Sequence, residues 1–137
     1  MRHTLLDTGP LVAYLGRKDA CHEWAVRQFA ALRPPLLTCE PVLAEACFLV
    51  ERNSGRPGNL LKLLQRGIFR IALNVESEAA ALESLMERYS DTPMSLADAC
   101  LVRMSEMHVD SRIFTMDSDF ERYHRNGRQI ITLIRPE

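Results

Sequence analysis

Short apolar segments alternate with longer amphipathic segments along the whole chain. The short segments have the composition of buried strands, and the longer ones carry apolar residues at helical spacing. Strands interleaved with helices are typical of a sheet whose strands are mainly parallel. We therefore expect an α/β fold, a three-layer α/β/α sandwich with a mainly parallel five-stranded sheet. The strands are expected over residues 3–6, 36–38, 69–75, 113–116 and 130–134.

The helices are expected in the intervals between these strands. Gly, Pro and capping residues mark where each helix begins and ends. The helices are expected after the turn at residues 8–10, from a cap at Asp19 to the stop at Pro34-Pro35, and over residues 41–52, 60–65, 77–89 and 95–108.

The chain has 137 residues, the size of one compact domain, and we expect a single domain over residues 1–137. Its 47% of apolar residues can form a core without disulfides. No apolar run is long enough to span a membrane, and the first residues do not resemble a signal peptide. The cysteines at positions 21, 39, 47 and 100 form no CxxC pair, so we expect reduced thiols and a cytoplasmic protein.

The overall charge does not indicate nucleic-acid binding, because the formal net charge is −1. The cations are nevertheless unevenly chosen, with 15 Arg and only 2 Lys. Arginine binds phosphate oxygens in a bidentate manner, but GC-rich coding also favours arginine. The arginines therefore leave both explanations open.

Four acidic residues lie where a site is expected. Asp7 directly follows the first expected strand and Asp117 follows the fourth, and the carboxyl edge of a parallel sheet is where functional groups gather. Asp98 lies in the first turn of an expected helix. Glu45 is the only charged residue in the apolar run of residues 41–50.

Each acidic residue also has a local structural explanation. Asp7 or Thr8 is suited to cap the helix that follows. Asp98, three residues after a serine, fits a capping box, and Asp117 fits an Asx turn that leads into a helix. Glu45 either lies on a narrow solvent-exposed stripe or is held against a cation, and we favour the cation because an unpaired buried carboxylate is unfavourable.

Four carboxylates brought together repel one another unless a cation neutralises them. Coordination by oxygen alone suits Mg²⁺ or Mn²⁺ rather than zinc, and the chain has no His/Cys cluster with zinc-ligand spacing. The pattern therefore predicts a magnesium or manganese site.

Four short motifs in this order resemble those of the PIN-domain family, and the closest likeness is to VapC-like toxin ribonucleases and their solitary relatives. The motifs are LLDTGPLV at residues 5–12, PVLAE at 41–45, MSLADA at 94–99 and FTMDSDF at 114–120. The resemblance implies a Mg²⁺- or Mn²⁺-dependent ribonuclease site at the carboxyl edge of a parallel sheet. Its acidic set is Asp7, Glu45, Asp98 and Asp117.

The resemblance also suggests a role for each site residue. Asp7 and Asp98 are expected to be the core metal ligands, with Asp117 completing the set, while Glu45 binds a second ion or orients the attacking water. Whether one ion or two act stays open. Thr8, Thr115 and Asp119 are expected in supporting positions. Arg122, Arg125 and Arg128 follow the fourth motif closely and are suited to contact an RNA backbone, but they fit a solvated basic face equally well.

The resemblance implies partners as well: an RNA substrate, a small antitoxin protein and a second copy of the chain in a homodimer. The main alternative is a non-catalytic RNA-binding or scaffold domain that retains the PIN fold. Two other acid-cluster enzymes fit less well. A haloacid-dehalogenase phosphatase needs an Asp two residues after Asp7, where this chain has Gly9, and a phosphorelay receiver needs a late lysine, whereas the last one here is Lys62.

Overall fold

A five-stranded sheet forms the centre of the computed structural model, which describes residues 2–137. The strand order is β3-β2-β1-β4-β7, and every neighbouring pair is parallel. The strands are β1 His3–Leu6, β2 Leu36–Thr38, β3 Phe69–Ile71, β4 Ser111–Phe114 and β7 Leu133–Ile134. The expected mainly parallel, five-stranded sheet is confirmed.

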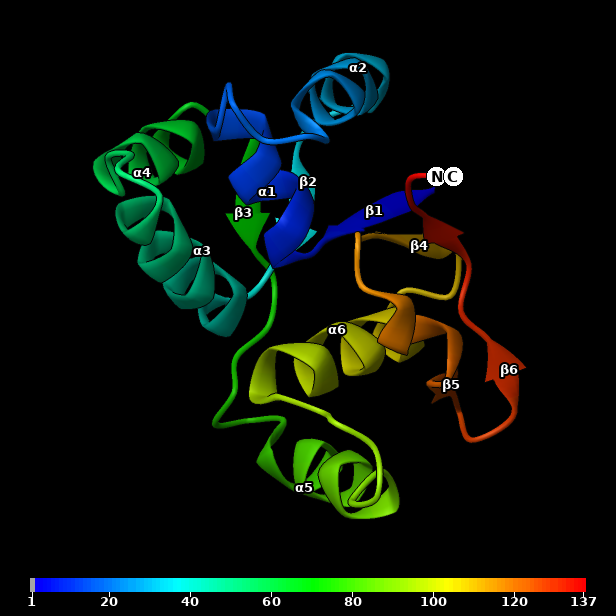
Figure 1. The fold of residues 1–137 in the computed structure, drawn as a ribbon. Coiled ribbons are helices and arrows are strands. Elements are labelled where there is room, and N and C mark those ends of the chain that lie inside the picture. The colour runs from blue at the N-terminus through cyan, green and yellow to red at the C-terminus, as the bar shows by residue number, and fades with distance from the viewer. Residues whose placement is uncertain (1) are drawn as a thin grey trace.

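Helices cover both faces of this sheet, as Figure 1 shows. One face carries α1 Thr8–Leu15, α2 His22–Ala31, α3 Glu40–Arg52 and α4 Gly58–Gln65. The other face carries α5 Ala79–Arg88 and α6 Leu96–Met107. The expected three-layer sandwich is therefore confirmed.

The two faces of the sheet bury separate apolar cores because successive strand residues point to opposite sides. In β1, Leu5 packs into the core beneath α5 and α6, whereas Leu6 packs into the core beneath α1 to α4. In β4, Ile113 and Phe114 divide in the same way. All four side chains are fully buried, so these two central strands are held firmly in register.

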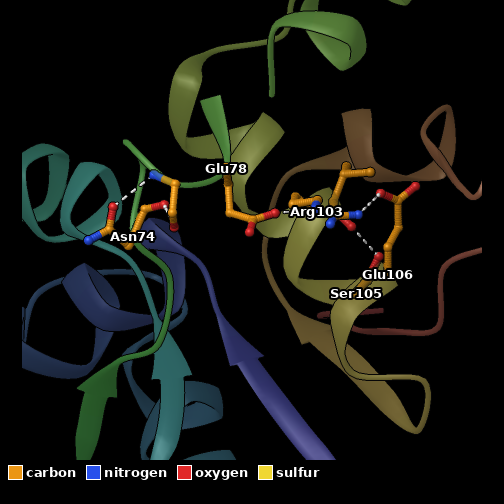
Figure 2. Close-up of polar contacts among 7 residues, drawn as sticks. Asn74, Glu78, Arg103, Ser105 and Glu106 are labelled. Carbon is orange, nitrogen blue, oxygen red and sulfur yellow. Dashed lines mark hydrogen bonds and ion pairs between the residues drawn. The ribbon is translucent and has the colours of Figure 1, made fainter. Parts of the chain in front are cut away.

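An ion-pair cluster ties α6 to the start of α5, and Figure 2 shows its side chains. The Nε of Arg103 donates to Oε1 of Glu78 at 2.6 Å, and its Nη1 donates to Oε1 of Glu106 at 3.3 Å. The other Glu106 oxygen accepts from the backbone N–H of Asn126 at 2.6 Å. This partly exposed cluster fixes α6, the helix that carries Asp98, against two other parts of the chain.

The third strand is shorter than expected. It was expected over residues 69–75, but β3 ends at Ile71. Its only partner in the sheet is β2, which ends at Thr38 and leads almost directly into α3. The Thr38 carbonyl accepts one last bond from the N–H of Ala72. Beyond that point the alternating residues have no strand beside them to extend the ladder.

The expected strand at residues 130–134 is divided in two. Ile130 belongs to β6 (Gln129–Ile130), which pairs antiparallel with β5 (His124–Arg125) outside the main sheet. Only the second part, β7, joins the central sheet, beside β4. The apolar run therefore serves two different partners, which its periodicity alone does not reveal.

Asp19 does not cap α2 as expected. The helix begins at His22, and the Asp19 side chain instead accepts a bond from the N–H of Cys21 at 2.8 Å. The backbone N–H of Asp19 donates to the Gly16 carbonyl, so a tight turn fills the interval in which the helix was expected to start.

Among residues 2–137, no helix combines the length and the apolar character needed to cross a membrane. The four cysteines are all unpaired, with Cys39 and Cys100 buried and Cys21 and Cys47 half-buried.

Candidate active site

The carboxyl ends of β1 and β4 form the floor of the candidate site. These strands are parallel neighbours in which Leu6 lies beside Phe114. The N–H of Asp7 continues the ladder by donating to the Phe114 carbonyl at 3.0 Å. Asp7 and Thr115 therefore leave the sheet at the same edge.

Asp7 is held in place by two hydrogen bonds. Its Oδ1 accepts from the N–H of Thr8 at 2.7 Å, so the side chain caps α1. Its Oδ2 accepts from the Thr115 hydroxyl at 2.6 Å. With only 6% of its surface exposed, Asp7 has little freedom to move.

Thr115 also positions the fourth acidic residue. Its Oγ1 accepts from the N–H of Asp117 at 2.9 Å, and the Thr115 side chain is fully buried. Asp117 in turn accepts from the N–H of Asp119 at 2.8 Å and caps the 3-10 helix Ser118–Glu121. One buried hydroxyl thus connects the Asp7 carboxylate with the backbone that carries Asp117.

Asp98 lies in the first turn of α6, within a capping box. The Ser95 hydroxyl accepts from the N–H of Asp98 at 3.0 Å, and Oδ2 of Asp98 accepts from the N–H of Ser95 at 3.2 Å. The same Oδ2 accepts from the Tyr123 hydroxyl at 3.3 Å. The capping box does not exclude a role in the site, because no bond within residues 2–137 occupies Oδ1 of Asp98.

Glu45 reaches the site from the second turn of α3. Its side chain is exposed and makes no ion pair with a cation within residues 2–137. Glu45 therefore lies on a solvent-exposed stripe of the helix, and no cation of residues 2–137 is held against it.

The four carboxylates face one open cavity of about 450 Å³. They come from the end of β1, from α3, from α6 and from the segment after β4. The lining residues are Asp7, Thr8, Gly9, Glu45, Leu49, Asp98, Met116, Asp117 and Ser118. The fold thus brings together all four acidic residues that the sequence predicted.

The electrostatics of the cavity oppose four negative charges. Burial raises the pKa of Asp7 to about 6, with smaller contributions from the charges of Asp98 and Asp117, although bonds from Thr115 and Thr8 act in the opposite direction. Burial likewise raises the pKa of Asp98, opposed by the bond from Ser95 and helped by the charge of Asp117. The pKa of Glu45 is raised by partial burial and then by Asp98 and Asp117. Each shift favours a neutral carboxyl unless positive charge enters.

The donor set fits a hard divalent cation in its chemistry. All four side chains offer carboxylate oxygens, which are preferred by Mg²⁺ and Mn²⁺. No group of three or more His, Cys, Asp or Glu side chains in residues 2–137 is already gathered closely enough to hold an ion.

The other predicted site residues lie at different distances from this cavity. Thr8 lines it, and the Thr8 hydroxyl is buried without a hydrogen-bond partner in the part of the chain that the structure describes. Asp119 contacts Asp117 through its backbone and does not line the cavity. Arg122 and Arg128 are exposed, but Arg125 is buried and its Nη1 donates to the Val109 carbonyl at 2.8 Å. Arg125 is therefore not available to an RNA backbone at the surface.

Tyr123 is the site residue that sequence reasoning missed. Its ring is buried, and its single hydroxyl proton is shared between the carbonyl of Pro93 and Oδ2 of Asp98, both within hydrogen-bond reach. Burial raises its pKa, so the hydroxyl stays protonated and able to donate. A tyrosine after the fourth motif carries no distinctive sequence signal, because its contact with Asp98 spans 25 residues and depends on the packing of α6.

A model of the PIN domain matches residues 4–126 of the chain, a segment that includes all four carboxylates. The chain belongs to the PIN-domain family. No curated protein matches it in sequence. The PIN fold accounts for the mainly parallel sheet, as the resemblance implied.

Two solved PIN-like structures of toxin systems share this architecture. VapC20 of Mycobacterium tuberculosis, a toxin that cleaves the sarcin-ricin loop, superposes with a TM-score of 0.78 at 22% identity, covering 97% of this chain and 99% of that chain. A chain of a toxin–antitoxin complex from Klebsiella pneumoniae gives a TM-score of 0.62 at 19% identity, covering 85% of this chain and 89% of that one. At these identities the likeness establishes the fold.

Proposed function

We propose that this PIN domain is a Mg²⁺- or Mn²⁺-dependent endoribonuclease of the VapC type. The observation that carries the proposal is the cavity onto which four carboxylates from four separate elements converge, none of them in an ion pair within residues 2–137. An arrangement that serves only stability would not gather like charges in this way, because the charges of Asp98 and Asp117 add to the burial that raises the pKa of Asp7 and Glu45.

Asp7, Asp98 and Asp117 are the residues that would hold the metal. A bound divalent ion supplies positive charge toward the scissile phosphate and lowers the pKa of a water. The protein's own part is orientation: Thr115 and the N–H of Thr8 fix Asp7, while Ser95 and Tyr123 fix Asp98. Each carboxylate keeps lone pairs that these bonds do not use and that are available to a metal ion.

Glu45 and Thr8 are suited to act on the reacting groups. Glu45 is exposed at the cavity and free of ion pairs within residues 2–137, so its carboxylate is able to accept a proton from the attacking water. The buried Thr8 hydroxyl lacks a partner in the described chain and is available to donate to a phosphate oxygen. Asp119 supports Asp117 through its backbone N–H.

The partners that we propose follow from the toxin systems with the same fold. A small antitoxin is supported by the likeness to a chain of the Klebsiella pneumoniae toxin–antitoxin complex, and a homodimer is proposed with it. Phe48 of α3 and Leu61 of α4 are exposed, which leaves apolar surface on these two helices for a protein partner. The unpaired cysteines agree with action in the cytoplasm.

A non-catalytic RNA-binding domain is the second candidate, because the carboxylates in residues 2–137 are not already gathered around an ion position. The two functions differ in whether RNA is cut.

The proposal is tested with purified protein and a mixed, end-labelled RNA pool in Mg²⁺, Mn²⁺ or EDTA. Cleavage is expected with metal and not in EDTA. Replacing Asp98 with Asn should reduce the cleavage rate by about 100-fold or more, the loss that follows removal of one electrostatic element of a site. The Asn side chain retains an acceptor for the N–H of Ser95, so the capping box and the fold should survive.

Asp91→Asn is the matched control, because Asp91 is exposed and does not line the cavity. It should cleave at the wild-type rate. Metal-independent cleavage, or an Asp98→Asn variant as active as Asp91→Asn, would refute the proposed site. RNA binding without any cleavage would favour the non-catalytic alternative.

A further inference from the structure

A second cavity, of about 650 Å³, lies at the far end of the two helices that flank the acidic cavity. Its walls come from residues 12–19, at the end of α1 and the connection to α2, and from residues 50–55, at the end of α3 and the turn that follows. We infer that this cavity is a nucleotide-binding subsite for the RNA strand whose scissile bond lies in the acidic cavity. The inference rests on the proposed nuclease function.

The two cavities follow one another along the same pair of helices. α1 and α3 each begin near the carboxyl edge of the sheet, after neighbouring parallel strands, and they pack side by side (Figure 1). Gly9 and Glu45 line the acidic cavity, whereas Gly16 and Asn53 line the second. At a helical rise of about 1.5 Å per residue, these positions are about 10 to 12 Å apart along each helix. That distance corresponds to about three steps of a stacked nucleic-acid strand.

The second cavity carries the positive charge that the acidic cavity lacks. Arg17 and Lys18 line it, are exposed, and make no ion pair within residues 2–137. Asp19 is the one acidic residue of the lining, and its Oδ1 is already bonded to the N–H of Cys21. The end of α3 and the turn that follows it add the exposed Arg52 and Arg56, beside the exposed Glu51.

The remaining lining suits a base and its sugar. Val12, Leu15 and Val50 provide an apolar wall, and Asn53 offers an amide with both a donor and an acceptor. The volume lies within the range of about 300 to 1,000 Å³ that is usual for small-ligand sites. No aromatic side chain lines the cavity, so the base packs on aliphatic groups and strong base selection is not expected.

RNA fits this cavity better than a protein partner because of the charge balance of the whole chain. With a net charge of −1 and an acidic reaction site, the protein has no general attraction for a polyanion. Binding of RNA therefore requires local cations near the site. Of the three arginines expected from the sequence for this task, Arg125 is buried. The unpaired Arg17 and Lys18 supply such cations within a few nucleotides of the acidic cavity.

The test uses a fluorescent single-stranded RNA of about 12 nucleotides, a length within the usual range of single-strand site sizes. Its binding is measured by fluorescence anisotropy in EDTA at several salt concentrations. The double variant Arg17→Gln/Lys18→Gln should raise Kd about tenfold at low salt. The slope of log Kd against log salt should also fall by about 1.4, because each phosphate contact contributes about 0.7 on a single strand. The control Arg27→Gln/Arg33→Gln removes the same charge from exposed residues outside the cavity and should change Kd by less than about twofold.

Because binding is measured without metal, its outcome is independent of cleavage. Equal losses of affinity in the two double variants would show a general charge effect and overturn the subsite. Unchanged affinity in Arg17→Gln/Lys18→Gln would also overturn it, leave the nuclease proposal standing, and direct attention to a protein occupant. If only Arg17→Gln/Lys18→Gln lost affinity and the wild-type protein did not cleave RNA, the cavity would stand as an RNA-binding subsite and the nuclease proposal would be rejected. A wild-type protein that neither binds nor cleaves RNA would reject both.

Discussion

Replacing Asp7 with Asn is expected to make the metal-free protein more stable and, at the same time, inactive. Asp7 is 6% exposed, and its pKa is raised from 3.8 to about 6, first because it is buried and then because Asp98 and Asp117 are charged. A neutral amide of the same shape avoids that penalty. It also removes the carboxylate that we propose as a core metal ligand.

The sign of the pH dependence follows from the two pKa values of Asp7. Between pH 4 and pH 6 the folded protein keeps a proton that the unfolded chain has released, so the folded state of the wild type loses stability as the pH rises through this interval. The two pKa values differ by about two units, which corresponds to a loss of about 3 kcal/mol in the free energy of unfolding once the pH is above 6. Below pH 4 Asp7 is protonated in both states, so this loss of stability is absent.

Urea denaturation in EDTA between pH 4 and pH 8 measures this effect. At pH 8 the Asp7→Asn variant is expected to unfold with a free energy about 1 to 3 kcal/mol above that of the wild type, and the two should converge near pH 4. Adding Mn²⁺ at about 100 times its Kd should stabilise the wild type by about 2.7 kcal/mol and the variant much less. Cleavage by the variant should fall by about 100-fold or more.

Asp91→Asn again serves as the control, and its stability should match the wild type at every pH because Asp91 is exposed. If Asp7→Asn were less stable than the wild type at pH 8, the bonds from Thr8 and Thr115 would outweigh the burial of charge. A variant stabilised by Mn²⁺ as strongly as the wild type would remove Asp7 from the metal site.

Local sequence patterns predicted much of the fold because they reflect local physics. The strand at residues 3–6 and the helix from residue 41 to Arg52 were close to the observed β1 and α3. Two errors in the strands occurred where a partner elsewhere in the chain decides the outcome. β3 stops where β2 leaves it without a neighbour, and the apolar run at residues 130–134 divides between β5 and β4. Strand propensity carries no information about the length of the partner strand.

The acidic residues of the site were predictable because strand ends and helix starts are visible in the sequence. The local explanations were correct: Asp7 caps α1, Asp98 completes a capping box and Asp117 caps a 3-10 helix. The two sets of explanations are compatible because each carboxylate has more lone pairs than its cap uses. Tyr123 could not be predicted, since its bond to Asp98 arises only when the segment after β4 folds over α6.

Replacing Thr115 with Val is expected to weaken the fold and the site together. The Thr115 hydroxyl donates to Oδ2 of Asp7 and accepts from the N–H of Asp117, so a side chain of similar shape without the oxygen breaks both bonds. Thr115 is fully buried, and water does not replace the lost partner of Asp7. The expected loss at pH 8 is about 2 to 4 kcal/mol in the free energy of unfolding.

The loss should be smaller at pH 5 than at pH 8. The bond from Thr115 lowers the pKa of Asp7 and so stabilises the charged carboxylate. When the pH is below the Asp7 pKa of about 6, the carboxyl is mostly neutral, and the bond from Thr115 contributes less to stability. Cleavage should fall about 10- to 100-fold, as is usual when a residue that orients a metal ligand is removed, and higher Mn²⁺ concentration should restore part of it.

Two variants separate this effect from a general loss of packing. Thr115→Ser keeps the hydroxyl and should retain most of the cleavage activity. Thr38→Val removes another fully buried hydroxyl, which donates to the Leu6 carbonyl at 2.7 Å and has no hydrogen bond to a carboxylate within residues 2–137. It should lower stability by about 1 kcal/mol without changing the Mn²⁺ dependence of cleavage. If Thr115→Val behaved like Thr38→Val in both measurements, the hydroxyl would contribute to the fold alone and the acidic site would not depend on it.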